Sequence, residues 1–178
     1  MTPLVGRPLI SYPLAAAREA GLQALVIAKH ETALPPLQEP VVYEREPLHH
    51  PLAGVLGALE QSSAVIALAC DMPFIPAAML RWIAAQSARS LVTRPGSFLQ
   101  PFPALYRREH LRSLRSSMRA QRSMQSSIEQ LRPKIVDDRE LRAFGAPLRL
   151  FFSVNTPADL RRAERWLQAR QPAATGQS

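Results

Sequence analysis

The sequence is poor in cysteine and has no long apolar run. Cys70 is its single cysteine, so no disulfide can form within the chain. No stretch of about 18 apolar residues is present, which excludes a membrane-spanning helix of ordinary length. No secretory signal is recognisable either. These absences predict a cytoplasmic protein that is not inserted in a membrane.

Acidic side chains are too few to balance the basic ones. Lys and Arg number 22 against 14 Asp and Glu, a formal net charge of +8 that is concentrated in the second half. This excess suits an anionic partner such as nucleic acid, a nucleotide or a phosphorylated cofactor. Hydrophobic residues make up 47% of the 178 residues, enough for the core of one domain. We expect that domain at residues 1–170 and a disordered polar tail at 171–178.

The chain is organised around one apolar run that ends on an acid. Val65 to Ala69 carries no charge and predicts a strand buried on both faces, with Asp71 just beyond its end. Pro73 and Pro76 then stop the strand and open a helix. In α/β sheets ligands bind at the carboxyl ends of the strands, so Asp71 could hold a divalent cation and its phosphates. Capping of the following turn is the alternative, at about even odds.

Strand-like and helix-like patterns alternate along the chain. We expect helices at 9–20, from the HHPLAG turn to about 61, and at 76–87, 109–118, 123–131 and 156–170. We expect strands at 24–28, 41–43, 65–69, 90–93, 100–106, 134–136 and 148–153. Strand 100–106 should lie at an edge because its two prolines limit ladder bonding. The alternation predicts a three-layer α/β fold with a mostly parallel sheet.

A basic segment and a few scattered ligand-type residues need separate interpretation. The segment carries arginines at nearly helical spacing: Arg107, Arg108, Arg112, Arg115, Arg119 and Arg122. A solvated helical face is the main interpretation, steering of an anionic cofactor or an acidic protein comes second, and nucleic acid is disfavoured because no aromatic platform accompanies the arginines. His49, His50 and Cys70 lack the spacing of a metal set. Cys70 is expected in the core rather than as a nucleophile.

Several motifs in register carry a family resemblance. They are GRPLI at Gly6 to Ile10, HPLAG followed by ACDMPF within His50 to Phe74, QPFPALYRR at Gln100 to Arg108, and VNTPADL at Val154 to Leu160. With them the chain resembles the molybdenum cofactor guanylyltransferases, the MobA-like branch of the GT-A-type nucleotidyltransferases. The resemblance implies a three-layer α/β/α Rossmann-like fold. It also implies transfer of GMP from GTP to the terminal phosphate of molybdopterin with Mg²⁺, releasing pyrophosphate, with apo-molybdoenzymes as further partners.

The resemblance also implies roles for single residues on the nucleotide side. Asp71 matches the metal-binding aspartate, which would hold Mg²⁺ between the phosphates. A turn beside the nucleotide corresponds to Pro51, Leu52, Ala53 and Gly54, with His50 where the family usually has Gly. Lys29 and Glu44 lie near a polar and an acidic position of the family. A helix-start turn is the alternative for the HPLAG motif, and a solvated surface is the alternative for Lys29 and Glu44.

On the acceptor side, the resemblance implies contacts to the pterin. Asn155 matches the asparagine of the NTP motif, and its amide can both donate and accept hydrogen bonds. Ser153 replaces the asparagine that is usual two positions earlier. The cap of the last helix is expected to use Thr156 and Asp159, which leaves the Asn155 side chain for another role.

The largest departure from the family concerns its phosphate loop. The pattern LAGGxSxRMGxxK, which cradles the triphosphate, and the first central strand before it do not occur in these residues. We therefore expect strands 24–28 and 65–69 on either side of a gap, or pulled together to close it, and no nucleotidyl transfer by the chain as written. A start codon assigned too late is one explanation. The alternative is a non-catalytic module that binds molybdopterin or assists its delivery. Guanine or cytosine specificity stays open.

Overall fold

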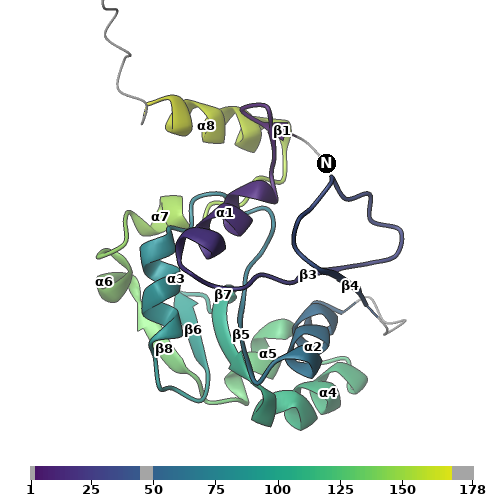
Figure 1. Cartoon of the computed structure of the whole chain (residues 1–178). Helices are drawn as coiled ribbons and strands as arrows, with labels where there is room; N and C mark the ends of the chain where they lie inside the picture. Colours follow the sequence, from purple (N-terminus) through teal and green to yellow (C-terminus); the bar gives the residue numbers. More distant parts are fainter. Residues whose placement is uncertain (1–2, 45–49, 170–178) are drawn as a thin grey trace, which may run out of the picture.

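A mixed four-stranded sheet forms the centre of the protein. The computed structural model describes residues 3–44 and 50–169. The strands are β5 (Ala64–Ala67), β7 (Gln100–Arg107), β6 (Leu91–Arg94) and β8 (Lys134–Asp137), in the spatial order β5-β7-β6-β8. A separate parallel pair contains β3 (Val26–Ala28) and β4 (Val41–Tyr43), and an antiparallel pair contains β1 (Pro3–Leu4) and β2 (Arg7–Pro8). Figure 1 shows β3 and β4 beside the larger sheet.

Helices cover both faces of the four-stranded sheet, so the three expected layers are present. One face is covered by α2 (Leu52–Gln61), α4 (Leu111–Arg119, preceded by the short helix η1 at Arg108–His110) and α5 (Met124–Glu129). The other is covered by α1 (Ser11–Glu19), α3 (Ala77–Ala84), α6 (Asp138–Leu141) and α7 (Pro147–Leu150). Figure 1 separates the two groups of helices clearly. None of the described helices is long and apolar enough to cross a membrane.

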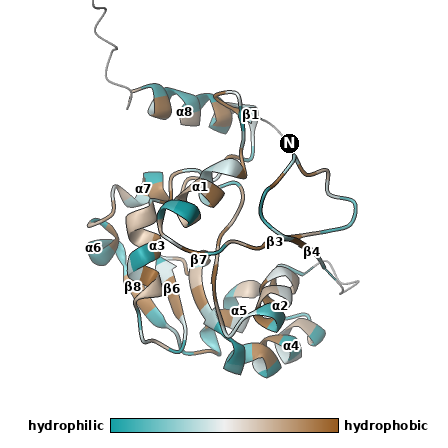
Figure 2. Cartoon of the chain, viewed as in Figure 1, coloured by the Kyte–Doolittle hydropathy of each residue, from teal (hydrophilic) through white to brown (hydrophobic). Residues whose placement is uncertain are grey.

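Alternating side chains of the strands fill the two cores. On β7, Ala104 and Tyr106 face the α2 layer, whereas Leu105 between them faces the α3 layer. The phenol of Tyr106 is fully buried and donates a hydrogen bond to the carbonyl oxygen of Pro101 at 3.1 Å. Burial raises the pKa of Tyr106, because the charged phenolate would lose its hydration. Figure 2 shows the hydrophobic residues on the strands and the hydrophilic surface of α6.

The last helix, α8 (Pro157–Gln168), packs on a third and smaller core. This core joins α8 to the β1–β2 hairpin through Leu4, Leu9, Phe74 and Ala163. Trp166 of α8 meets the ring of Phe74 edge-on, with the ring centroids 5.6 Å apart. The helix begins with the expected capping box, so its local start signal is confirmed.

The expected edge position of the proline-containing strand is wrong. β7 lies inside the sheet, between β5 and β6. The ladder with β5 uses only residues 104–107 of β7, and the ladder with β6 is irregular between Leu91 and Thr93. Pro101 and Pro103 therefore fall outside the first ladder and at the irregularity of the second, where a missing N–H donor is tolerated.

Two further expectations about strands are also wrong. The large sheet is mixed rather than mostly parallel, because β7 runs antiparallel to both of its neighbours. The short connection 95–99 between β6 and β7 can only join antiparallel strands. Residues 148–153 form no strand either: Pro147 occupies the first turn of α7, and its fixed φ favours that helical turn.

The strand before Asp71 is less buried than expected. All four residues of β5 are half-buried, because β5 lies at an edge of its sheet and has a ladder partner on one side only among the described residues. β3 and β5 belong to different sheets, as the expected gap between them requires. Helix α2 contacts both strands and so spans the space between the two sheets. The predicted tail at 171–178 lies outside the described residues.

Candidate functional site

Asp71 and the NTP-motif segment lie side by side in the structure. Asp71 sits half-buried in the turn that follows β5. Its carbonyl oxygen accepts a hydrogen bond from the backbone N–H of Val154 at 2.9 Å. Ser153, half-buried, and Asn155, exposed, flank Val154 and are therefore held next to the aspartate. The structure thus brings together three residues that the sequence analysis placed on the metal and acceptor sides.

The helix cap beside this segment uses the backbone of Asn155 but not its side chain. One carboxylate oxygen of Asp159, Oδ2, accepts from the N–H groups of Asn155 and Thr156, at 3.2 Å and 2.9 Å. The Thr156 hydroxyl donates to the same oxygen at 2.8 Å, and the Asp159 N–H donates to that hydroxyl at 3.2 Å. The Thr156 hydroxyl is the main cause that lowers the pKa of Asp159. The Asn155 side chain takes no part in the cap, and the residue is exposed.

Cys70 contradicts its expected place in the core. β5 ends at Ala67, and Cys70 lies beyond it in an exposed turn. Desolvation of the sulfur, and secondly the negative charge of neighbouring Asp71, raise the pKa of the Cys70 thiol. The thiol is therefore a weak nucleophile at neutral pH, although the residue is accessible.

A second group of candidate residues gathers where β3 and β4 end. The backbone N–H of Glu44 donates to the carbonyl oxygen of Ala28 at 2.9 Å, which extends the parallel pairing by one residue. Lys29, half-buried, follows β3 at the same end. The Glu44 carboxylate lies over Gly54 in the first turn of α2, since a Cβ on this glycine would be 3.6 Å from Glu44 Oε1. Lys29, Glu44 and Gly54 thus share one end of the small sheet.

The HPLAG turn serves mainly to start α2. The Leu52 N–H donates to His50 Nδ1 at 3.1 Å, and His50 Nε2 lies 2.8 Å from the carbonyl oxygen of Arg122. The Ala53 N–H donates to the carbonyl oxygen of His50 at 2.9 Å. Two of the amide donors that could bind an anion at this helix start are therefore already used. Pro51 is exposed, whereas the Leu52 side chain is fully buried, so a contact of Leu52 with a nucleotide would use its backbone.

The residues around Asp71 fit a metal ion that arrives with its phosphates. The described part of the chain contains no cluster of three or more His, Cys, Asp or Glu side chains that could hold an ion. Mg²⁺ is commonly bound by one or two carboxylates together with substrate phosphates and water. A single half-buried carboxylate at the end of β5 matches that mode rather than a permanent metal centre.

Two contacts of this site have no signal in the sequence. The Val154 N–H reaches the Asp71 carbonyl, and the Glu44 carboxylate reaches the first turn of α2. Each joins segments that are distant along the chain, so local patterns could not reveal them.

A small hollow of about 120 Å³ lies between β4 and α2, beside Gly57 and Tyr43. Neither this hollow nor a larger one on α4 is lined by Asp71 or Asn155.

Comparison with known protein families identifies the family of this chain. The model of the MobA-like NTP transferase domain matches residues 1–135. The chain belongs to this family. The MobA-like match includes both groups of residues described above, except for the NTP-motif segment at 153–155, which lies beyond it.

Curated relatives and a solved structure agree with the MobA-like assignment. A probable molybdenum cofactor guanylyltransferase of Peptoclostridium acidaminophilum is 27% identical over 146 residues, which cover 76% of this chain and 65% of the relative. A protein of the same name from Pelotomaculum thermopropionicum is 36% identical over 118 residues, covering 64% and 58%. The chain thus spans less than two thirds of the length of either relative.

The solved structure is molybdopterin-guanine dinucleotide biosynthesis protein A from Archaeoglobus fulgidus. It superposes with a TM-score of 0.77 at 22% identity, covering 94% of this chain and 89% of the other. This similarity shows an α/β nucleotidyltransferase fold.

Proposed function

We propose that this MobA-like domain acts as a molybdenum cofactor guanylyltransferase. It would transfer GMP from GTP to the terminal phosphate of molybdopterin with Mg²⁺. The activity is the one named for the curated relatives, which the chain matches over part of their length, and the two substrates are those that the motif resemblance implies. The observation that carries the proposal is the hydrogen bond between Val154 and Asp71, which holds an exposed amide beside a carboxylate at the end of β5.

The proposed reaction exchanges one phosphorus–oxygen bond for another. An oxygen of the molybdopterin phosphate forms a bond to the α-phosphorus of GTP, and the bond from that phosphorus to its bridging oxygen breaks, so pyrophosphate leaves. A bound Mg²⁺ would supply the positive charge that the approaching phosphates need. Asp71 would hold the ion, and the Asn155 amide would donate or accept hydrogen bonds at the acceptor. Ser153, half-buried on the other side of Val154, would be a further contact to the acceptor.

The nucleotide would lie between the two groups of site residues. Gly54 presents no side chain, which lets the Glu44 carboxylate lie over the first turn of α2, where it would face the nucleotide. Lys29 supplies positive charge at the end of β3 for the phosphates. Glu44 and the exposed Pro51 complete this side, where the carboxylate would accept hydrogen bonds from the nucleotide.

A second candidate is a non-catalytic module that binds molybdopterin or assists its delivery to an apo-molybdoenzyme. One observation favours it. Among the described residues, β3 and β5 lie in separate sheets, so no continuous ladder between them supports a phosphate loop.

Translation of the gene in frame upstream of Met1, followed by a paired assay, separates the two candidates. A glycine-rich loop followed by lysine would support the enzyme, and an in-frame stop would support the module. The 178-residue chain and any extended product are incubated with GTP, Mg²⁺ and molybdopterin, and the dinucleotide is measured by chromatography. We expect turnover from the extended product and none from the 178-residue chain. Turnover by the shorter chain at the rate of an intact relative would contradict this expectation.

Asp71→Asn in the active product tests the metal ligand. The change keeps the shape and capping ability of the side chain but removes its charge. Turnover should fall by roughly a hundredfold or more, with a melting temperature within a few degrees of wild type. Asp138→Asn is the matched control, because that carboxylate accepts only from the N–H of Gly96, at 3.2 Å, in the described contacts. Wild-type turnover in Asp71→Asn would leave Asp71 as a turn residue.

The module makes a different prediction for the acceptor residues. If neither chain turns over, molybdopterin should still be retained by the protein on gel filtration, detected by pterin fluorescence. Asn155→Ala should then reduce retention, whereas Asp71→Asn should leave it nearly unchanged. Absence of both turnover and retention would reject both candidates.

A further inference from the structure

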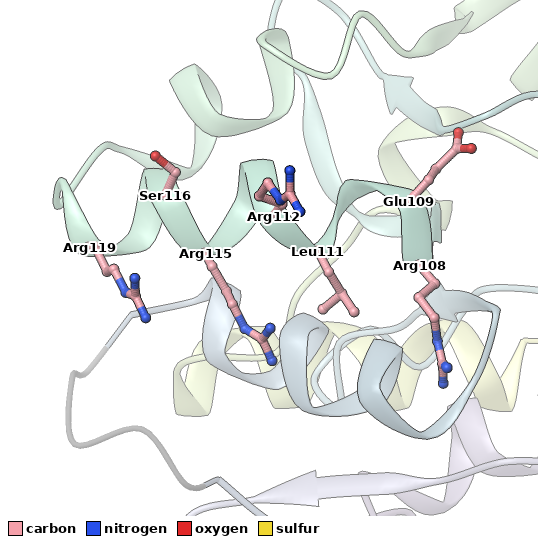
Figure 3. Close-up of a pocket in the computed structure, with 7 residues that line it drawn as sticks. All are labelled: Arg108, Glu109, Leu111, Arg112, Arg115, Ser116 and Arg119. Carbon is pink, nitrogen blue, oxygen red and sulfur yellow. The ribbon is translucent and has the colours of Figure 1, made fainter.

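We propose that the exposed face of α4 is a docking surface for an acidic helix of a partner protein. The face is built on Arg112, Arg115 and Arg119, which we call the arginine stripe. Figure 3 shows these residues along one helix, around a hollow of about 710 Å³ that Arg108, Glu109, Leu111 and Ser116 also line. This surface is separate from Asp71 and Asn155, so the inference does not depend on the proposed function.

Part of the basic segment is occupied by structural contacts. The guanidinium of Arg108 donates to backbone carbonyls at the end of α2, including that of Glu60 at 2.9 Å. Arg115 forms an ion pair with the carboxylate of Glu60, and Glu109 is paired with Arg89 at 2.7 Å. These contacts neutralise both carboxylates near the hollow.

The other two arginines of the stripe, Arg112 and Arg119, have no charged partner within the described part of the chain. Arg112 and Arg119 are exposed, and no hydrogen bond or ion pair of their side chains is present there. Ser116, exposed and small, also lines the hollow. Lys29 and Lys134 are the only lysines of the protein, so nearly all of its positive charge is carried by guanidinium groups. Arginine is enriched at protein interfaces and pairs with carboxylates in a bidentate manner.

The geometry favours a helix that carries carboxylates over a nucleic acid. Positions 112, 115 and 119 follow the three- and four-residue spacing of one helical face, so a helix lying along α4 can present acidic residues at the same spacing. No aromatic side chain lines the hollow, and single-stranded nucleic acid gains much of its affinity from stacking on such rings. Leu111 adds an apolar contact that suits a protein surface better than a phosphate backbone.

A peptide-binding experiment tests the surface directly. The probe is a fluorescein-labelled, alanine-rich helical peptide with glutamates at positions i, i+4, i+7 and i+11, and anisotropy is measured with the full 178-residue chain. The control peptide has the same composition with its glutamates spread around the helix. We expect the patterned peptide to bind at least about fivefold more tightly than the control peptide, and both to weaken as salt rises.

Charge-reversal variants test whether binding depends on the arginine stripe or only on the net charge of the protein. The double variant Arg112→Glu/Arg119→Glu should weaken binding of the patterned peptide about tenfold or more. Arg161→Glu/Arg165→Glu on the exposed surface of α8 is the matched control and should change binding less than twofold. Circular dichroism checks folding, and Arg112→Gln/Arg119→Gln replaces the first variant if it unfolds.

Several results would overturn the proposal. They are equal binding of the two peptides, equal effects of the two charge-reversal variants, or no binding of the patterned peptide at low salt. A single-stranded oligonucleotide that binds more tightly than the peptide, and that is lost in Arg112→Glu/Arg119→Glu, would assign the surface to nucleic acid instead.

Discussion

Replacement of His50 by alanine should destabilise the start of α2. The Leu52 N–H donates to Nδ1 at 3.1 Å, so Nδ1 is an acceptor, and Nε2 carries the hydrogen that points to the Arg122 carbonyl at 2.8 Å. Each hydrogen bond contributes about 1 kcal/mol net. Loss of both should lower the free energy of unfolding by about 2 kcal/mol, because the ring is half-buried and water replaces it incompletely.

Urea denaturation and thermal melting measure this change. For a domain of this size, about 2 kcal/mol corresponds to a fall of roughly 4–8 °C in melting temperature. His50→Asn is the matched variant, because its side-chain oxygen can still accept from the Leu52 N–H but cannot reach Arg122. We expect it to lose about half as much stability as His50→Ala. A His50→Ala variant within about 0.5 kcal/mol of wild type would refute the reasoning and leave the ring available for a ligand.

Three further predictions follow from single contacts. Thr156→Ala should destabilise the protein by about 1 kcal/mol near pH 7. The Thr156 cap lowers the pKa of Asp159 in the folded state. The stability that this contact contributes is therefore present above the unfolded pKa of about 3.9 and is lost as pH falls through the folded value. The Thr156→Ala and wild-type urea curves should converge in acid. Leu59→Ala should cost about 2–5 kcal/mol in the same assay, because Leu59 is fully buried on the core-facing side of α2; a loss below about 1 kcal/mol would contradict this packing. Asp71→Asn should speed alkylation of Cys70 by iodoacetamide at pH 8, because it removes a charge that raises the thiol pKa; an unchanged rate would contradict that electrostatic contact.

Local signals in the sequence predicted most helices and part of the strands. The cap of α8 was predicted correctly because its contacts lie within four residues of one another, between Asn155 and Asp159. The same holds for α3, whose apolar positions at Met79, Leu80 and Ile83 share one buried face. The strand expected at residues 148–153 is wrong because a short apolar run is compatible with strand or helix, and Pro147 favours a helical turn.

The order of the strands was decided by the tertiary structure alone. Nothing near Pro101 or Pro103 indicates that β7 lies inside the sheet, since the ladder with β5 begins only at Ala104. Membership of β3 and β5 in different sheets follows from partners that are distant in the sequence. Strand pairing depends on matching long-range surfaces and backbone donors, which a local pattern does not contain.

The candidate site shows the same division. The sequence by itself determined that Asp71 follows an apolar strand, that Asn155 precedes a capped helix, and that arginines recur at helical spacing on α4. Only the tertiary structure decided that Val154 binds the Asp71 carbonyl, that Leu52 is buried in the core, and which arginines are paired. The physical reason is that spacing along a chain fixes which side chains share a face, whereas burial and charge pairing depend on the element that packs against that face.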